Sequence, residues 1–77
     1  MQSVMICLNS IDKVKHFVNI ITQYDGDFDL SSGRYVIDAK SIMGIFSLDL
    51  SKPLRLDIYN DTIIEELKPL IEEYITP

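Results

Sequence analysis

Apolar residues fall into short segments along the chain, and their spacing predicts a series of small elements. Residues 2–8 form a nearly continuous apolar run, which is typical of a buried strand. Residues 11–23 carry apolar side chains at helical spacing and predict an amphipathic helix. Ser10 precedes this helix as a good N-cap, and Asp12 lies favourably in its first turn. The apolar stripe of the helix consists of Ile11, Val14, Phe17 or Val18, and Ile21.

The middle of the chain predicts a hairpin followed by a short helix. Residues 28–30 and 34–38 read as two strands, and residues 31–33 supply the turn between them. The segment 42–48 is too long and too apolar for a loop. We interpret it as a short helix that is capped by Ser41.

The last third predicts one strand and one helix. Residues 54–59 alternate cleanly between apolar and polar, as in a half-buried strand. Thr62 and Glu65 have the spacing of a capping box, so the last helix should begin there. Pro69 falls on the polar side of that helix and should kink it. The apolar stripe consists of Ile63, Ile64, Leu67, Leu70, Ile71, Tyr74 and Ile75.

The order of elements is therefore β-α-β-β-α-β-α, which favours an α+β fold. Four strands with one alternating face suit an antiparallel-rich sheet that has helices packed on one side. A chain of 77 residues suggests a single domain spanning residues 1–77, and any function must lie on the surface of so small a protein.

Charge and cysteine content exclude several classes of function. The net charge of -5 comes from 12 acidic and 7 scattered basic residues, so the chain has no electrostatic footprint for nucleic acid or an anionic membrane. No apolar run approaches the roughly 20 residues of a membrane span. Cys7 is the single cysteine and cannot form an intrachain disulfide, which indicates a reducing compartment and a cytoplasmic protein.

The same composition offers little to a metal or cofactor. Cys7 lies in an apolar run, where a buried and inert thiol is expected, with a reactive thiol as the alternative. Cys7 and His16 are nine residues apart, which matches no zinc spacing. We therefore expect neither a metal nor a cofactor.

One local string resembles a known family. The segment Lys40-Ser41-Ile42-Met43-Gly44-Ile45-Phe46-Ser47-Leu48 is similar to the K-S-I-M-G-x-x-S-L segment of the histidine-containing phosphocarrier (HPr) family of the sugar phosphotransferase system. The element order and residues 24–30 are also similar to that family. The resemblance implies an HPr-like open-faced β-sandwich, in which three helices cover one face of a four-stranded antiparallel sheet.

The chain departs from the family at the start of the first helix. HPr proteins carry phosphate there on the histidine of a G-x-H-x-R-P-type motif. An ungapped count places Ser10 at the histidine position, Asp12 at the arginine position and Lys13 at the proline position. A carrier needs an imidazole that holds a labile phosphoramidate and a cation that neutralises its charge. The only histidine, His16, lies about two turns into the helix, where we expect a surface residue. The departure predicts no histidine phosphocarrier activity.

Two further features follow from the resemblance. In Gram-positive relatives the serine of K-S-I-M-G is phosphorylated by an ATP-dependent kinase, so Ser41 is a candidate for regulatory phosphorylation. The alternative is that Ser41 serves only as a helix cap. The counterparts of Ile42, Met43 and Phe46 form an exposed apolar patch that docks partner proteins. The alternative is that these residues join Ile45 and Leu48 in the core.

The sequence therefore favours an HPr-like regulatory or protein-binding module, with phosphotransferase-system proteins or the HPr serine kinase as partners. One alternative is an atypical phosphoacceptor that uses Ser10 or His16. Another is a structural homodimer through residues 42–46. An enzyme is not expected: Asp25, Asp27 and Asp29 suit a solvated face or a weak cation site better than acid–base catalysis.

Overall fold

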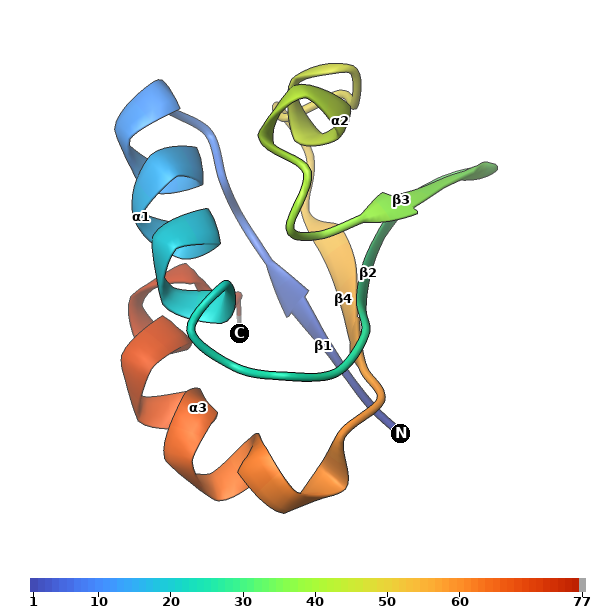
Figure 1. Ribbon diagram of the computed structural model, residues 1–77. Helices are drawn as coiled ribbons and strands as arrows, with labels where there is room; N and C mark the ends of the chain where they lie inside the picture. The colour runs from blue at the N-terminus through green and yellow to red at the C-terminus, as the bar shows by residue number, and fades with distance from the viewer. Residues whose placement is uncertain (77) are drawn as a thin grey trace.

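The fold is a four-stranded antiparallel sheet with helices over one face (Figure 1). The structure, a computed structural model, describes residues 1–76. The strands are β1 (Gln2–Ile6), β2 (Phe28–Ser32), β3 (Tyr35–Asp38) and β4 (Leu54–Ile58). The helices are α1 (Ile11–Ile21), α2 (Ile42–Phe46) and α3 (Ile64–Ile71), with 3-10 turns η1 (Asp61–Ile63) and η2 (Glu72–Tyr74). The predicted order and the α+β class are confirmed.

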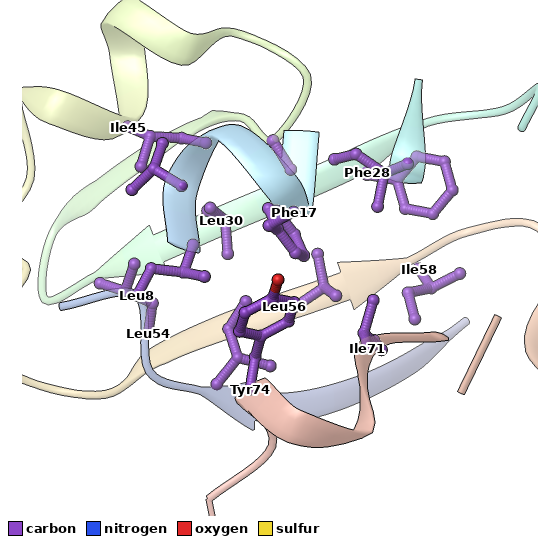
Figure 2. Close-up of a cluster of buried hydrophobic side chains, with 14 of the residues drawn as sticks. Leu8, Phe17, Phe28, Leu30, Ile45, Leu54, Leu56, Ile58, Ile71 and Tyr74 are labelled. Atoms are coloured by element: carbon purple, nitrogen blue, oxygen red, sulfur yellow. The ribbon is translucent and has the colours of Figure 1, made fainter. Parts of the chain in front are cut away.

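The sheet has the strand order β1-β4-β2-β3, so β4 lies inside it and β3 lies at an edge. Leu54, Leu56 and Ile58 of β4 point toward the helices and are fully buried. These side chains meet those of α1, α3 and β2 in one core (Figure 2). The core consists of Ile6, Leu8, Val14, Phe17, Ile21, Phe28, Leu30, Ala39, Ile45, Leu48, Leu54, Leu56, Ile58, Ile64, Leu67, Ile71 and Tyr74.

Both predicted serine caps are confirmed. Ser10 has extended backbone, and its Oγ accepts a hydrogen bond from the backbone N–H of Lys13 at 3.1 Å. The Oγ of Ser41 accepts in the same way from the backbone N–H of Gly44 at 3.1 Å. Each serine satisfies a donor that would otherwise lack a partner in the first turn of a helix.

The first strand is less buried than its composition predicts. Within β1 only Ile6 is fully buried, while Met5 is exposed on the face that carries no helix. Cys7 is half-buried, which corrects the expectation of a buried thiol. Its backbone N–H donates to the carbonyl of Tyr74 at 2.7 Å. An apolar run in an edge strand can thus leave alternate side chains uncovered.

Several boundaries differ from the prediction. The first strand ends at Ile6 rather than at residue 8, and β4 ends at Ile58 rather than at residue 59. The first helix ends at Ile21 rather than at residue 23, and α2 ends at Phe46 rather than at residue 48. The hairpin turns at Gly33 and Arg34 instead of at residues 31–33. Gly33 adopts φ of +59°, a left-handed conformation that favours glycine and suits a two-residue hairpin turn.

The last helix starts differently from the predicted capping box. The Asn60 side-chain oxygen accepts from the backbone N–H of Thr62 at 3.1 Å and from its hydroxyl at 2.6 Å. The Thr62 hydroxyl is therefore used as a donor, and α3 begins at Ile64 without a side-chain cap. Pro69 lies inside α3 on its exposed side, as predicted. Leu70 is 48% exposed and does not belong to the buried stripe, which corrects that assignment.

Candidate functional site

The start of α1 presents polar side chains that are already engaged with one another. Ser10 holds the backbone N–H of Lys13, as described above, and the Lys13 ammonium donates to the Asn9 side-chain oxygen at 3.0 Å. Asp12 is exposed in the first turn, where its negative charge is favourable at the positive end of the helix dipole. Neither an imidazole nor a guanidinium is present in this turn.

The short helix α2 lies against β3 through Gly44. A Cβ at this position would lie 3.1 Å from the Ser41 Oγ and 3.5 Å from the Ile37 Cβ. Glycine therefore lets the serine cap close over the first turn while the helix stays near the sheet. The second turn is closed by Ser47, whose hydroxyl donates to the Gly44 carbonyl.

An open groove of about 560 Å³ separates the start of α1 from the end of α2. It is lined by Asn9, Ser10, Ile11, Phe46, Leu50 and Ser51. Ile11 is 61% exposed in this groove, whereas the helical spacing predicts it in the core. The buried stripe begins at Val14 instead, because Ile11 faces the open groove.

Apolar side chains of α2 other than Phe46 are also accessible to solvent. Met43 is 76% exposed and Phe46 is 40% exposed, while Ile42 is half-buried. We call Ile42, Met43 and Phe46 the α2 patch. Ile45 and Leu48, in contrast, are buried as predicted. The alternative that all five residues belong to the core is therefore wrong.

A tight turn at residues 49–51 forms the side of the groove that lies across from Ser10. The Asp49 carboxylate accepts from the backbone N–H of Ser51 at 3.1 Å and from its hydroxyl at 2.6 Å. These hydrogen bonds, chiefly that of the hydroxyl, lower the pKa of Asp49. The turn fixes Ser51 opposite Ser10 on the same groove.

Lys40 has a structural role that the sequence did not indicate. Its ammonium donates to the Tyr24 carbonyl at 2.7 Å and lies 5.3 Å from the centre of the Phe28 ring. It thereby ties the segment before α2 to the loop after α1. No sequence signal separates this lysine from a surface lysine, because both partners come from distant parts of the chain.

The structure brings some predicted site residues together and separates others. Ser10 and Phe46 line the same groove, while Ser41 stands at the opposite end of α2. His16 is exposed, as predicted, six residues after Ser10 and so about 9 Å farther along the helix axis. Among residues 1–76, no charged side chain lines the groove, although the Lys13 ammonium donates to the lining residue Asn9. The contributions of Asn9, Leu50 and Ser51 were missed, since they depend on how two distant segments meet.

The remaining candidates do not form a catalytic cluster. Asp25, Asp27 and Asp29 do not assemble with other ligands: residues 1–76 contain no group of three or more histidine, cysteine or acidic side chains placed to hold a metal. Asp29 instead accepts a hydrogen bond from the Tyr59 hydroxyl at 3.0 Å. Within the same part of the chain, no helix has both the length and the apolar character needed to cross a bilayer.

Comparison with known proteins identifies the fold. No protein-family model matches the chain, and no curated protein matches it. Among solved structures, the crystal structure of HPr-C-His from Thermoanaerobacter tengcongensis is similar, with a TM-score of 0.75 and 26% sequence identity. The similarity covers 95% of this chain and 93% of that chain. The chain therefore has an HPr-like fold.

Proposed function

We propose that this HPr-like chain is a regulatory or protein-binding module of the phosphotransferase system that lacks histidine phosphocarrier activity. The observation that carries the proposal is the exposed α2 patch, which meets a groove lined by Phe46 and Ser10. Ser10 is the residue that the ungapped count assigns to the histidine position of the family. Exposed Met and aromatic side chains beside a groove suit adaptable docking of a protein partner. The module acts in the cytoplasm, in keeping with its single cysteine.

The chemistry of the groove argues against phosphoryl transfer. Ser10 could at most form a phosphate ester, which is too stable to be passed on as a carrier requires. No lysine or arginine is among the residues within 1–76 that line the groove, and the Lys13 ammonium beside it is already hydrogen-bonded to the Asn9 side chain. Asp12 adds a negative charge beside it. The module therefore binds partners without relaying phosphate.

Ser41 gives this module a point of regulation. Its side chain is exposed, and the resemblance to the K-S-I-M-G segment covers it fully. A phosphate on Ser41 would introduce about two negative charges at the start of α2, next to the α2 patch. Phosphorylation by the HPr serine kinase would therefore change which partners the patch accepts.

Binding to the purified HPr serine kinase tests the docking surface. Phe46→Asp should weaken binding by roughly 30-fold or more, because a charge would replace a central apolar contact. Leu70→Asp is the matched control, since Leu70 is also an apolar helical residue with similar exposure but lies on α3. Equal affinity of the two variants, with circular dichroism that shows both folded, would refute the α2 patch as the docking surface.

Two mass measurements test the phosphorylation chemistry. With ATP and the kinase, intact mass should show one added phosphate that is absent in Ser41→Ala. With phosphoenolpyruvate and the phosphotransferase-system enzyme that phosphorylates HPr, no phosphate should be added. Added phosphate in the second reaction would overturn the proposal, and its loss in Ser10→Ala or His16→Ala would identify the acceptor.

A further inference from the structure

One edge of the sheet is partly covered and the other is open. The outer edge of β1 is covered near its end by the C-terminal segment, where Ile6 bridges to Ile75 and the backbone N–H of Thr76 donates to the Met5 carbonyl at 2.9 Å. The strand β3 pairs only with β2, and no other part of residues 1–76 lies along its outer edge as a strand. An uncovered edge is a template for pairing with another chain.

The backbone of β3 offers hydrogen-bonding groups to such a chain. Ala39 donates to the Phe28 carbonyl at 2.8 Å, so the odd-numbered residues of this segment turn their backbone groups toward β2. Because the pattern alternates, the N–H and C=O of Val36 point away from the sheet. The side chain of Val36 is 59% exposed as well. The edge also lacks the lysine, proline or bulge with which natural edge strands discourage pairing.

The charges around β3 are unbalanced within one copy. The register places Asp57, Asp29 and Asp38 in one row on the open face of the sheet. Asp57 is paired with Arg55, and Asp29 accepts from the Tyr59 hydroxyl. Asp38 ends the row at the open edge, where its carboxylate accepts from the backbone N–H of Lys40 at 2.9 Å. Its backbone carbonyl accepts from the backbone N–H of Ser41, also at 2.9 Å. Within residues 1–76, neither Asp38 nor the exposed Arg34 of the hairpin turn forms an ion pair.

We propose that a second copy of this chain pairs with the outer edge of β3 in antiparallel register, with Val36 opposite Val36 across a two-fold axis. This register places Arg34 of each copy opposite Asp38 of the other, on the same open face. The two valines exchange a pair of backbone hydrogen bonds, and on the helix face Tyr35 meets Ile37 of the second copy. The two sheets thereby become one continuous sheet.

The charges select this register over its neighbours. A register shift that keeps each side chain on its own face of the sheet changes the sum of the two paired residue numbers by two. Arg34 and Asp38 then no longer lie opposite each other, so both arginine–aspartate pairs are lost. With Ile37 opposite Ile37, for example, Asp38 would face Val36 instead of a cation. Opposite charges directly across a strand pair stabilise it, and like charges destabilise it.

The dimer should be weak, because each copy contributes a strand of only four residues. Such an interface falls below the area of stable complexes and dissociates on dilution. The two-fold axis is perpendicular to the sheet, so the helices of both copies lie on the same side. The proposal is independent of the docking function, since it uses neither the α2 patch nor the groove.

Sedimentation velocity with three variants tests the pairing. For the wild type, the mean mass should rise from 8.8 kDa toward twice that value as concentration increases from about 10 µM to about 1 mM, the range in which weak complexes form. R34E and D38K should each weaken dimerisation about tenfold or more, because both ion pairs become repulsive. R34K retains the charge and should dimerise like the wild type.

An equimolar mixture of R34E and D38K tests the proposed register directly. In the mixed dimer, the glutamate of R34E faces the lysine of D38K, while the unchanged Arg34 and Asp38 face each other. Recovery of the dimer in the mixture supports the register. A monomeric wild type at all concentrations overturns the proposal, as does R34E that dimerises like R34K. The same conclusion holds if F46D abolishes the dimer while R34E does not. If D38K fails to fold, the comparison of R34E with R34K still decides.

Discussion

Replacement of Gly44 by alanine tests how closely α2 and its cap are fitted together. The added Cβ would lie 3.1 Å from the Ser41 Oγ, closer than ordinary van der Waals contact. The same Oγ already accepts the backbone N–H of residue 44 at 3.1 Å. The serine can relieve the contact only by moving away, which lengthens the capping hydrogen bond.

Two opposing effects determine how much Gly44→Ala changes the free energy of unfolding. Alanine is favoured over glycine in a helix by about 1 kcal/mol. Loss of a serine cap costs about 1 kcal/mol. In the wild-type background these effects nearly cancel, so Gly44→Ala should change the free energy of unfolding by less than about 0.5 kcal/mol. In a Ser41→Ala background no hydroxyl remains to be displaced, and the next atoms, the Cβ atoms of residues 41 and 37, lie at 3.4 and 3.5 Å. There Gly44→Ala should stabilise by about 1 kcal/mol.

Urea denaturation of the wild type, Gly44→Ala, Ser41→Ala and the double variant measures the difference between the two backgrounds as a double-mutant cycle. For a domain of this size, 1 kcal/mol corresponds to a shift in Tm of roughly 4–8 °C, so thermal melts provide a second readout. A gain of about 1 kcal/mol in both backgrounds would refute the reasoning, because it would mean that Ser41 accommodates the methyl group at no cost.

Two further predictions concern buried polar groups. Asp57 is 4% exposed, and its carboxylate accepts from the Ser3 hydroxyl at 2.6 Å beside the Arg55 guanidinium. In urea denaturation, Asp57→Ala should lower the free energy of unfolding by about 2 kcal/mol and Ser3→Ala by about 1 kcal/mol. Equal effects of the two variants would contradict the assignment of the carboxylate as the centre of this hydrogen-bond network. Burial raises the pKa of Tyr74 to about 12, while an unfolded tyrosine ionises near 10, so the free energy of unfolding should fall as the pH rises from about 10 to about 12. Tyr74→Phe should flatten that decline in urea titrations across the range, and an unchanged slope would refute it.

Local features were predicted well because the interacting groups are close in sequence. The caps at Ser10 and Ser41 each need only a serine and a backbone N–H three residues later. The order of elements follows from the apolar spacing, which each segment carries by itself. The prediction was wrong where two neighbouring residues could act as the cap. Thr62 was expected to cap the last helix, but its backbone N–H and its hydroxyl both donate to the Asn60 side-chain oxygen.

Burial was harder to predict, since it depends on which face another element covers. Ile11 and Val14 lie on the same helical stripe, yet only Val14 is buried in the core. Leu70 has the spacing of a core residue but is half exposed on α3. Cys7 lies in an apolar run, but the run belongs to an edge strand. Identical local patterns thus led to different exposure.

The amino-acid sequence by itself determined the elements, the caps at Ser10 and Ser41, and the absence of histidine and arginine from the first turn of the first helix, because these are properties of single residues and short spacings. Only the tertiary structure decided that Ser10, Ile11 and Phe46 share a groove, and that β3 is left with an open edge beside Arg34 and Asp38. Those juxtapositions depend on how segments far apart in the chain pack together. The free energy of that packing comes from contacts throughout the core, so no single segment determines it.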